Sequence, residues 1–151
     1  MIDAASMMKA SERLWITSGS GAALQAALTA AKVGEVQLLD GAQARDKAAF
    51  MTAIARALRF PDYFGHNWDA LVDCLDELHW RDEPIVLVVD HGDELLADAP
   101  GEIDTLLGVI DEAFAPNPEL PHSALKVVVA ATPSAPILAQ ARKRGLAVGQ
   151  L

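Results

Sequence analysis

Two hydrophobic patterns alternate along this chain. Short apolar or alternating runs, which are typical of β-strands, occupy residues 13–18, 35–40, 84–90 and 124–132. Helical spacing or a high alanine content predicts helices over residues 22–32, 44–59, 67–80 and 102–115. Because strands separated by helices form crossover connections, the alternation predicts an α/β fold with a mainly parallel sheet.

Prolines mark where several of these elements end. Pro61 ends the helix of residues 44–59, because the residue before a proline is pushed away from helical angles. The three prolines within residues 116–123 exclude regular structure from that segment. A last helix is predicted to end at Arg144, and residues 146–151 are predicted to form a short edge strand.

The composition narrows the class of protein. The chain has 151 residues, of which 52% are hydrophobic and 22% charged, and this predicts a single domain with one core. No apolar run reaches the length of a membrane span and no signal-peptide pattern opens the sequence, so we expect a cytoplasmic protein without a membrane partner. A net charge of −9 disfavours nucleic-acid binding, which needs clustered Lys and Arg, and favours a cationic partner.

Most of the negative charge lies on one predicted helix and its flanks. Residues 61–83 carry seven acidic side chains against the single base Arg81. Asn67 is a suitable N-cap for a helix that runs to about Trp80. One side of that helix carries Asp69, Asp73, Asp76 and Trp80, with His66 and Val72 at its margins. The opposite side carries Leu71, Cys74, Leu75 and Leu78, so we expect a core face and an exposed acidic stripe, defined as Asp69, Asp73 and Asp76.

An acidic helix face is often only a solvated surface. Here, however, both close pairs on the stripe join Asp to Asp, and like charges at this spacing destabilise a helix by about 0.2–0.5 kcal/mol each. Aromatic residues also surround the start of the helix. Phe64 is predicted to be a core residue, Gly65 to be left-handed or closely packed, and Trp68 to be either core or interface. Tyr63 and Trp80 beside the acidic stripe are typical of a protein interface.

At these residues the sequence resembles the barstar family of intracellular ribonuclease inhibitors. The shared pattern is a proline, one residue, Tyr63, an aromatic, Gly65, one residue, Asn67, one residue, and then Asp69-Ala70-Leu71-Val72-Asp73-Cys74-Leu75. The resemblance implies a core of about residues 35–131 with a three-stranded parallel sheet, which the segments 1–34 and 132–151 extend to four or five strands. We expect the N-terminal segment to add a strand and a helix at one edge of the sheet.

The resemblance also implies roles for individual residues. Asp73 looks like the carboxylate that occupies the substrate-phosphate site of a basic ribonuclease, and Asp69 looks like its partner against the cationic rim. Tyr63 is similar to the aromatic residue that covers the catalytic histidine, and Glu112 aligns with an acidic interface residue on the next helix. The sequence departs from the family where Val72 replaces a tryptophan, His66 replaces an acidic residue and Trp80 is displaced from a family tryptophan.

The predicted partner-binding set is Tyr63, His66, Asn67, Trp68, Asp69, Val72, Asp73, Asp76, Trp80 and Glu112. We expect a monomeric inhibitor without cofactor or metal, which binds a basic ribonuclease. One rival is a module of the same fold for another cationic protein, because a fold does not fix its partner. The other is a metal-dependent enzyme using Asp69, Asp73 and His66, which the histidine spacing disfavours. The segment Gly19-Ser20-Gly21 lacks the rest of a nucleotide fingerprint and predicts only a turn.

Overall fold

A computed structural model describes residues 3–115, 119 and 125–151 of the chain. The described strands form one parallel sheet in the order β2-β3-β4-β1-β5. They are β1 (Leu14–Thr17), β2 (Glu35–Asp40), β3 (Ile85–Asp90), β4 (Leu125–Ala130) and β5 (Val148–Gln150). The α-helices are α1 (Ala4–Lys9), α2 (Gly21–Ala30), α3 (Lys47–Ala57), α4 (Trp68–Leu78), α5 (Ile103–Ala113) and α6 (Pro136–Arg144). Short 3-10 helices are η1 (Gly41–Gln43), η2 (Gly92–Glu94) and η3 (Pro100–Glu102). The predicted α/β class is confirmed.

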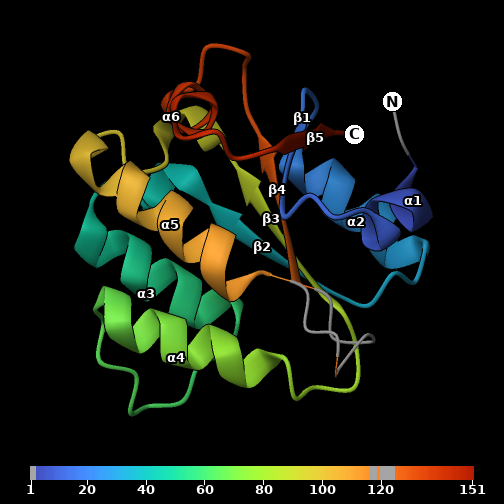
Figure 1. The fold of residues 1–151 in the computed structure, drawn as a ribbon, viewed down its shortest axis with the longest axis horizontal. Coiled ribbons are helices and arrows are strands. Elements are labelled where there is room, and N and C mark those ends of the chain that lie inside the picture. The colour runs from blue at the N-terminus through green and yellow to red at the C-terminus, as the bar shows by residue number, and fades with distance from the viewer. Residues whose placement is uncertain (1–2, 116–118, 120–124) are drawn as a thin grey trace.

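The sheet separates two hydrophobic layers (Figure 1). Helices α1 and α2 cover one face, where Met7 and Leu28 pack with Trp15 and with Val86 and Val88 of β3. Helices α3, α4, α5 and α6 lie on the other side, where the alternate residues of β3 join the larger core. Because successive side chains of a strand point to opposite faces, the continuous apolar run of β3 supplies both layers.

The N-terminal segment adds β1 beside β4, the outer strand of the core sheet β2-β3-β4, and adds helices α1 and α2. Strand β1 pairs with β4 on one side and with β5 on the other, so it lies inside the sheet and not at its edge. The edge position belongs to β5, as residues 146–151 predict. Helix α1 was not predicted, because its six residues are too few to show a periodic pattern. Apart from Glu119, the predicted loop of residues 116–123 lies outside the described residues.

Candidate functional site

Helix α4 is fixed in one rotation by its cap and its apolar face. The side-chain oxygen of Asn67 accepts a hydrogen bond from the Ala70 amide at 2.8 Å, so this predicted site residue is also the N-cap. The predicted core face is confirmed, since Leu71, Cys74, Leu75 and Leu78 are all buried in the larger core. A helix held in this way must present its opposite side to solvent.

The acidic stripe is exposed and carries its charges unpaired. Asp69, Asp73 and Asp76 are all exposed, and within residues 3–115, 119 and 125–151 none of them forms an ion pair. Their mutual repulsion is therefore not offset inside the described part of the chain. The stripe is available to a cationic partner.

Arg81, the base of the acidic segment, is directed away from the stripe. Its guanidinium donates to the Glu35 carboxylate at 2.9 Å and to the Leu58 carbonyl at 3.2 Å. Arg59 pairs with the same carboxylate. Partial burial acts to raise the pKa of Glu35, but hydrogen bonds from Gln37, Arg59 and Arg81 outweigh it and hold that pKa below its usual value. Glu35 thus holds both arginines, and neither of them pairs with the stripe.

Two aromatic side chains stand out in solvent near α4. Tyr63 is 71% exposed and Trp80 is 77% exposed. The Tyr63 hydroxyl donates to the Glu77 carboxylate, with distances of 3.1 and 3.3 Å to its two oxygens. This hydrogen bond is the main reason why the pKa of Tyr63 lies above its usual value. Exposed aromatic rings beside unpaired carboxylates are common at protein interfaces.

In the turn before α4, Gly65 takes the second of its two predicted roles, a closely packed position. The left-handed residue is His66, with a φ of 54°, and Gly65 keeps a negative φ. Gly65 is closely packed, because a Cβ there would lie 3.2 Å from the side-chain nitrogen Nδ2 of Asn67. The exposed His66 ring packs on Phe64 with centroids 4.8 Å apart, and Phe64 is a core residue, as predicted.

Trp68 and Val72 connect α4 to the rest of the protein. The Trp68 indole N–H donates to the Glu102 carboxylate at 2.8 Å, and its ring lies 5.8 Å from that of Phe50. Val72 is half-buried and packs against the larger core. Both residues belong to the helix that carries the acidic stripe, and each buries part of its side chain against the larger core.

Glu112 is exposed near the carboxyl end of α5. The imidazole of His79, which caps the end of α4, lies 2.9 Å from the Ala113 carbonyl. This contact brings the carboxyl ends of α4 and α5 together, so Glu112 lies where α5 adjoins α4 (Figure 1). The sequence did not reveal the part played by His79, because its partner is 34 residues away.

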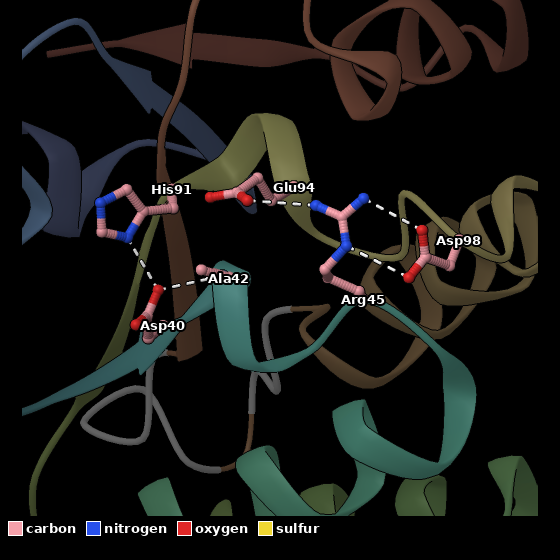
Figure 2. A network of polar contacts seen from close by, with 6 residues as sticks. All are labelled: Asp40, Ala42, Arg45, His91, Glu94 and Asp98. Carbon is pink, nitrogen blue, oxygen red and sulfur yellow. Dashed lines mark hydrogen bonds and ion pairs between the residues drawn. The ribbon is translucent and has the colours of Figure 1, made fainter.

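A second polar cluster lies at the carboxyl ends of β2 and β3 (Figure 2). His91, with a φ of 48°, places its Nδ1 atom 2.7 Å from an Asp40 carboxylate oxygen. Arg45 spans Glu94 and Asp98 at 3.0–3.1 Å. The hydrogen bond to Asp40, followed by the nearby charge of Asp90, raises the pKa of His91. These contacts join the segments that follow β2 and β3.

The described residues contain no group of three or more His, Cys, Asp and Glu side chains placed to hold a metal ion. Cys74 is buried, as predicted, and burial is the main cause that raises the pKa of its thiol. No described helix is long and apolar enough to cross a membrane.

Comparison with known proteins identifies the family. The profile described as "Barstar (barnase inhibitor)" matches residues 35–125. This chain belongs to the barstar family. It is also 34% identical, over 76 residues, to the "Putative ribonuclease inhibitor YrdF" of Bacillus subtilis (strain 168), which covers 50% of this chain and 81% of that protein. The resemblance inferred from residues 61–75 is confirmed, and at the level of the family the chain is a barstar-like inhibitor.

Solved structures of larger proteins share the fold of this barstar-family chain. The Aeropyrum pernix ORC2 protein (ADP form) superposes with a TM-score of 0.61 at 15% identity, covering 93% of this chain and 42% of that one. Drosophila ORC bound to AT-rich DNA and Cdc6 gives 0.59 at 12% identity, covering 97% and 50%. Cdc6p from Pyrobaculum aerophilum gives 0.51 at 21% identity, covering 91% and 38%. The chain spans half or less of these proteins, and the similarity shows the fold alone.

Proposed function

We propose that this protein inhibits a basic ribonuclease by inserting the acidic stripe of α4 into the active site of the enzyme. The observation that carries the proposal is that Asp69, Asp73 and Asp76 are exposed and form no ion pair with any described residue, while Arg81, the one base of residues 61–83, is held by Glu35. The family description, which names barnase inhibition, supplies the class of target. The protein acts without a cofactor, as a monomer in the cytoplasm before it meets the enzyme.

The physical basis is imitation of an RNA backbone. A ribonuclease binds a phosphodiester with Arg, Lys and His, so carboxylates held on a rigid helix complement the same groups. Asp73 lies in the middle of the stripe and is assigned to the phosphate position, with Asp69 against the cationic rim. Binding to cations relieves the Asp–Asp repulsion of the free protein, and complementary charge speeds the encounter at low salt.

The remaining members of the predicted set surround this centre. Tyr63 and Trp80 supply exposed rings that cover apolar or imidazole surface of the enzyme. Glu112 adds a peripheral carboxylate from α5, and peripheral charges affect the association rate more than the affinity. His66 and Asn67 shape the turn that presents Tyr63, and Trp68 and Val72 line the base of the surface.

The experiment that tests this proposal measures binding and residual RNA cleavage together. Barnase and other basic ribonucleases are titrated with the protein at low salt, and cleavage of a fluorogenic RNA is followed in the same samples. The proposal predicts that complex formation and loss of cleavage rise together to a 1:1 endpoint. Glu83→Ala, which removes one exposed carboxylate that lies off the stripe, should inhibit as the wild type does.

The rival function is a barstar-like module for a cationic protein that is not a ribonuclease. An acidic stripe complements any suitable basic groove, so its charge alone does not distinguish the two targets. Tight binding to a basic ribonuclease with cleavage intact would favour this rival. Absence of binding to every ribonuclease in the set would overturn the ribonuclease proposal.

A nucleotide function, suggested by the ADP form of the Aeropyrum pernix protein, does not fit the described residues. In parallel sheets, phosphates bind at the N-terminus of a helix that follows a strand. Here the first amide of α2, that of Gly21, already donates to the Asp90 carboxylate at 3.0 Å, and a Cβ on Gly21 would lie 2.8 Å from Asp90. Asp90, Asp93 and His91 line an open hollow of about 450 Å³ at this place, and the two carboxylates outnumber the one imidazole that could attract a phosphate. We expect ADP with Mg²⁺ to leave the melting temperature unchanged.

A further inference from the structure

Glu77 is a residue of α4 that lies outside the predicted binding set. Tyr63 and Glu77 are 14 residues apart, and the hydroxyl of Tyr63 lies within 3.3 Å of both oxygens of the Glu77 carboxylate. No other described residue forms a hydrogen bond with the Tyr63 hydroxyl. This contact therefore ties the exposed ring to α4.

The base that follows Glu77 along the chain is engaged elsewhere. Arg81 comes four residues after Glu77 but lies beyond Leu78, where α4 ends. Arg81 instead donates to Glu35 and to the Leu58 carbonyl. The side chain of Glu77 is exposed, and its described hydrogen bonds are those with Tyr63.

The contact places Tyr63 on a defined side of the acidic stripe. Glu77 lies one helical turn after Asp73, about 40° around the helix from it. Tyr63 therefore lies along the flank of α4 that adjoins Asp73.

We propose that Glu77 is a positioning residue, which holds the Tyr63 ring beside Asp73 before any partner binds. An exposed tyrosine without this hydrogen bond would sample several rotamers and would lose that freedom on binding. Fixing the ring in advance reduces this cost and slows dissociation. The effect on binding rests on the proposed inhibitory function, whereas the positioning itself is a property of the free protein.

The first test uses the fact that Tyr63 is the single tyrosine of the chain. Absorbance at 295 nm during an alkaline titration reports the ionisation of this residue alone, and circular dichroism in the same samples checks that the protein stays folded. Because the protonated hydroxyl donates to a carboxylate, the wild-type pKa should lie above the usual value for tyrosine. Glu77→Ala should lower the tyrosine pKa, while the matched control Glu83→Ala should leave it unchanged. A Glu77→Ala variant that titrates as the wild type does would overturn the proposal.

The second test separates positioning from the charge of Glu77. Glu77→Gln removes the charge but keeps a hydrogen-bond acceptor, and Tyr63→Phe keeps the ring but removes the donor. With barnase as the partner, Glu77→Gln should dissociate nearly as slowly as the wild type, and Glu77→Ala about threefold to tenfold faster. In the Tyr63→Phe background, Glu77→Ala and Glu77→Gln should dissociate equally fast, because the donor is absent.

If the dissociation rates of Glu77→Ala and Glu77→Gln differ by the same factor with and without the Tyr63→Phe substitution, Glu77 does not act through the hydroxyl, and the proposal is overturned. If barnase does not bind at all, the inhibitory function fails with that enzyme. The tyrosine titration then still decides whether Glu77 positions Tyr63.

Discussion

Replacing Asp73 by alanine should make the free protein more stable. Asp73 has three acidic neighbours on the exposed side of α4, namely Asp69 four residues before it, Asp76 three after it and Glu77 four after it. Each like-charged pair at this spacing costs about 0.2–0.5 kcal/mol, so removing the charge should return about 0.6–1.5 kcal/mol. Alanine is also a better helix former than aspartate by about 0.5–0.7 kcal/mol.

The expected gain for Asp73→Ala is therefore about 1–2 kcal/mol of unfolding free energy. For a domain of this size, that corresponds to a rise in melting temperature of about 3–6 °C. The assay is urea denaturation together with a calorimetric scan at pH 7 and low salt. Asp73→Asn isolates the charge contribution, and Leu75→Ala, which truncates a buried residue of the same helix, should cost about 2–5 kcal/mol.

The salt dependence of stability tests whether relief of charge repulsion causes the expected gain of Asp73→Ala. At 1 M salt, charges more than about 3 Å apart are largely screened, so the advantage of Asp73→Asn should nearly vanish and that of Asp73→Ala should fall to its helix-propensity part. A melting temperature that drops on Asp73→Ala would refute the reasoning. Asp73 would then be a structural residue with a stabilising contact, and its exposed charge could not be explained by binding.

Three further predictions concern contacts that link distant segments. Glu35→Gln should lower stability by about 1–2 kcal/mol at pH 7. Because the folded pKa of Glu35 is depressed, this difference should persist above about pH 4.3 and disappear as the pH falls through the folded pKa, as followed by urea denaturation. Asp40→Asn should lower the pKa of His91, measured by NMR of the imidazole. In the wild type the stabilising contribution of protonated His91 is complete below about pH 6.5 and is lost as the pH rises through its raised pKa. Trp68→Phe should cost about 1–2 kcal/mol in urea denaturation, because the Glu102 carboxylate loses its indole donor.

The parts of the fold that follow from local pattern were predictable. The continuous apolar run of β3 is typical of a strand buried on both faces. The structure agrees, because both hydrophobic layers include side chains of β3. The rotation of α4 followed from the spacing of Leu71, Cys74, Leu75 and Leu78, since a helix has only one way to bury such a stripe. The position of β1 between β4 and β5 was not predictable, because strand order is set by packing between segments more than 100 residues apart.

In the candidate site, too, some features were predictable from local pattern and others were not. Exposure of Asp69, Asp73 and Asp76 follows from the helical period, and the structure describes them as exposed. The pairs that shape the site join Arg81 to Glu35 across 46 residues and Trp68 to Glu102 across 34. No sequence period links residues so far apart, and this is why the unpaired state of the stripe could be established only from the structure.

The sequence left two roles open for Gly65, a left-handed position or a closely packed one, and did not decide between them. Glycine usually occupies left-handed positions because it has no Cβ, so Gly65 was the natural candidate for one. The chain instead places His66 in that region and uses Gly65 where a side chain would press on Asn67. Propensity ranks residues one at a time, whereas here the packing of two neighbours decides which of them takes the positive φ.

The most direct test of the central claim is the inhibition constant of Asp73→Ala against a ribonuclease that the wild-type protein inhibits. If Asp73 occupies the phosphate position, its loss leaves buried cationic groups of the enzyme unpaired, and the inhibition constant should rise by at least about 30-fold, equivalent to about 2 kcal/mol. Glu112→Ala, at the periphery, should change it by less than about fivefold. An Asp73→Ala protein that inhibits as well as the wild type would contradict the account.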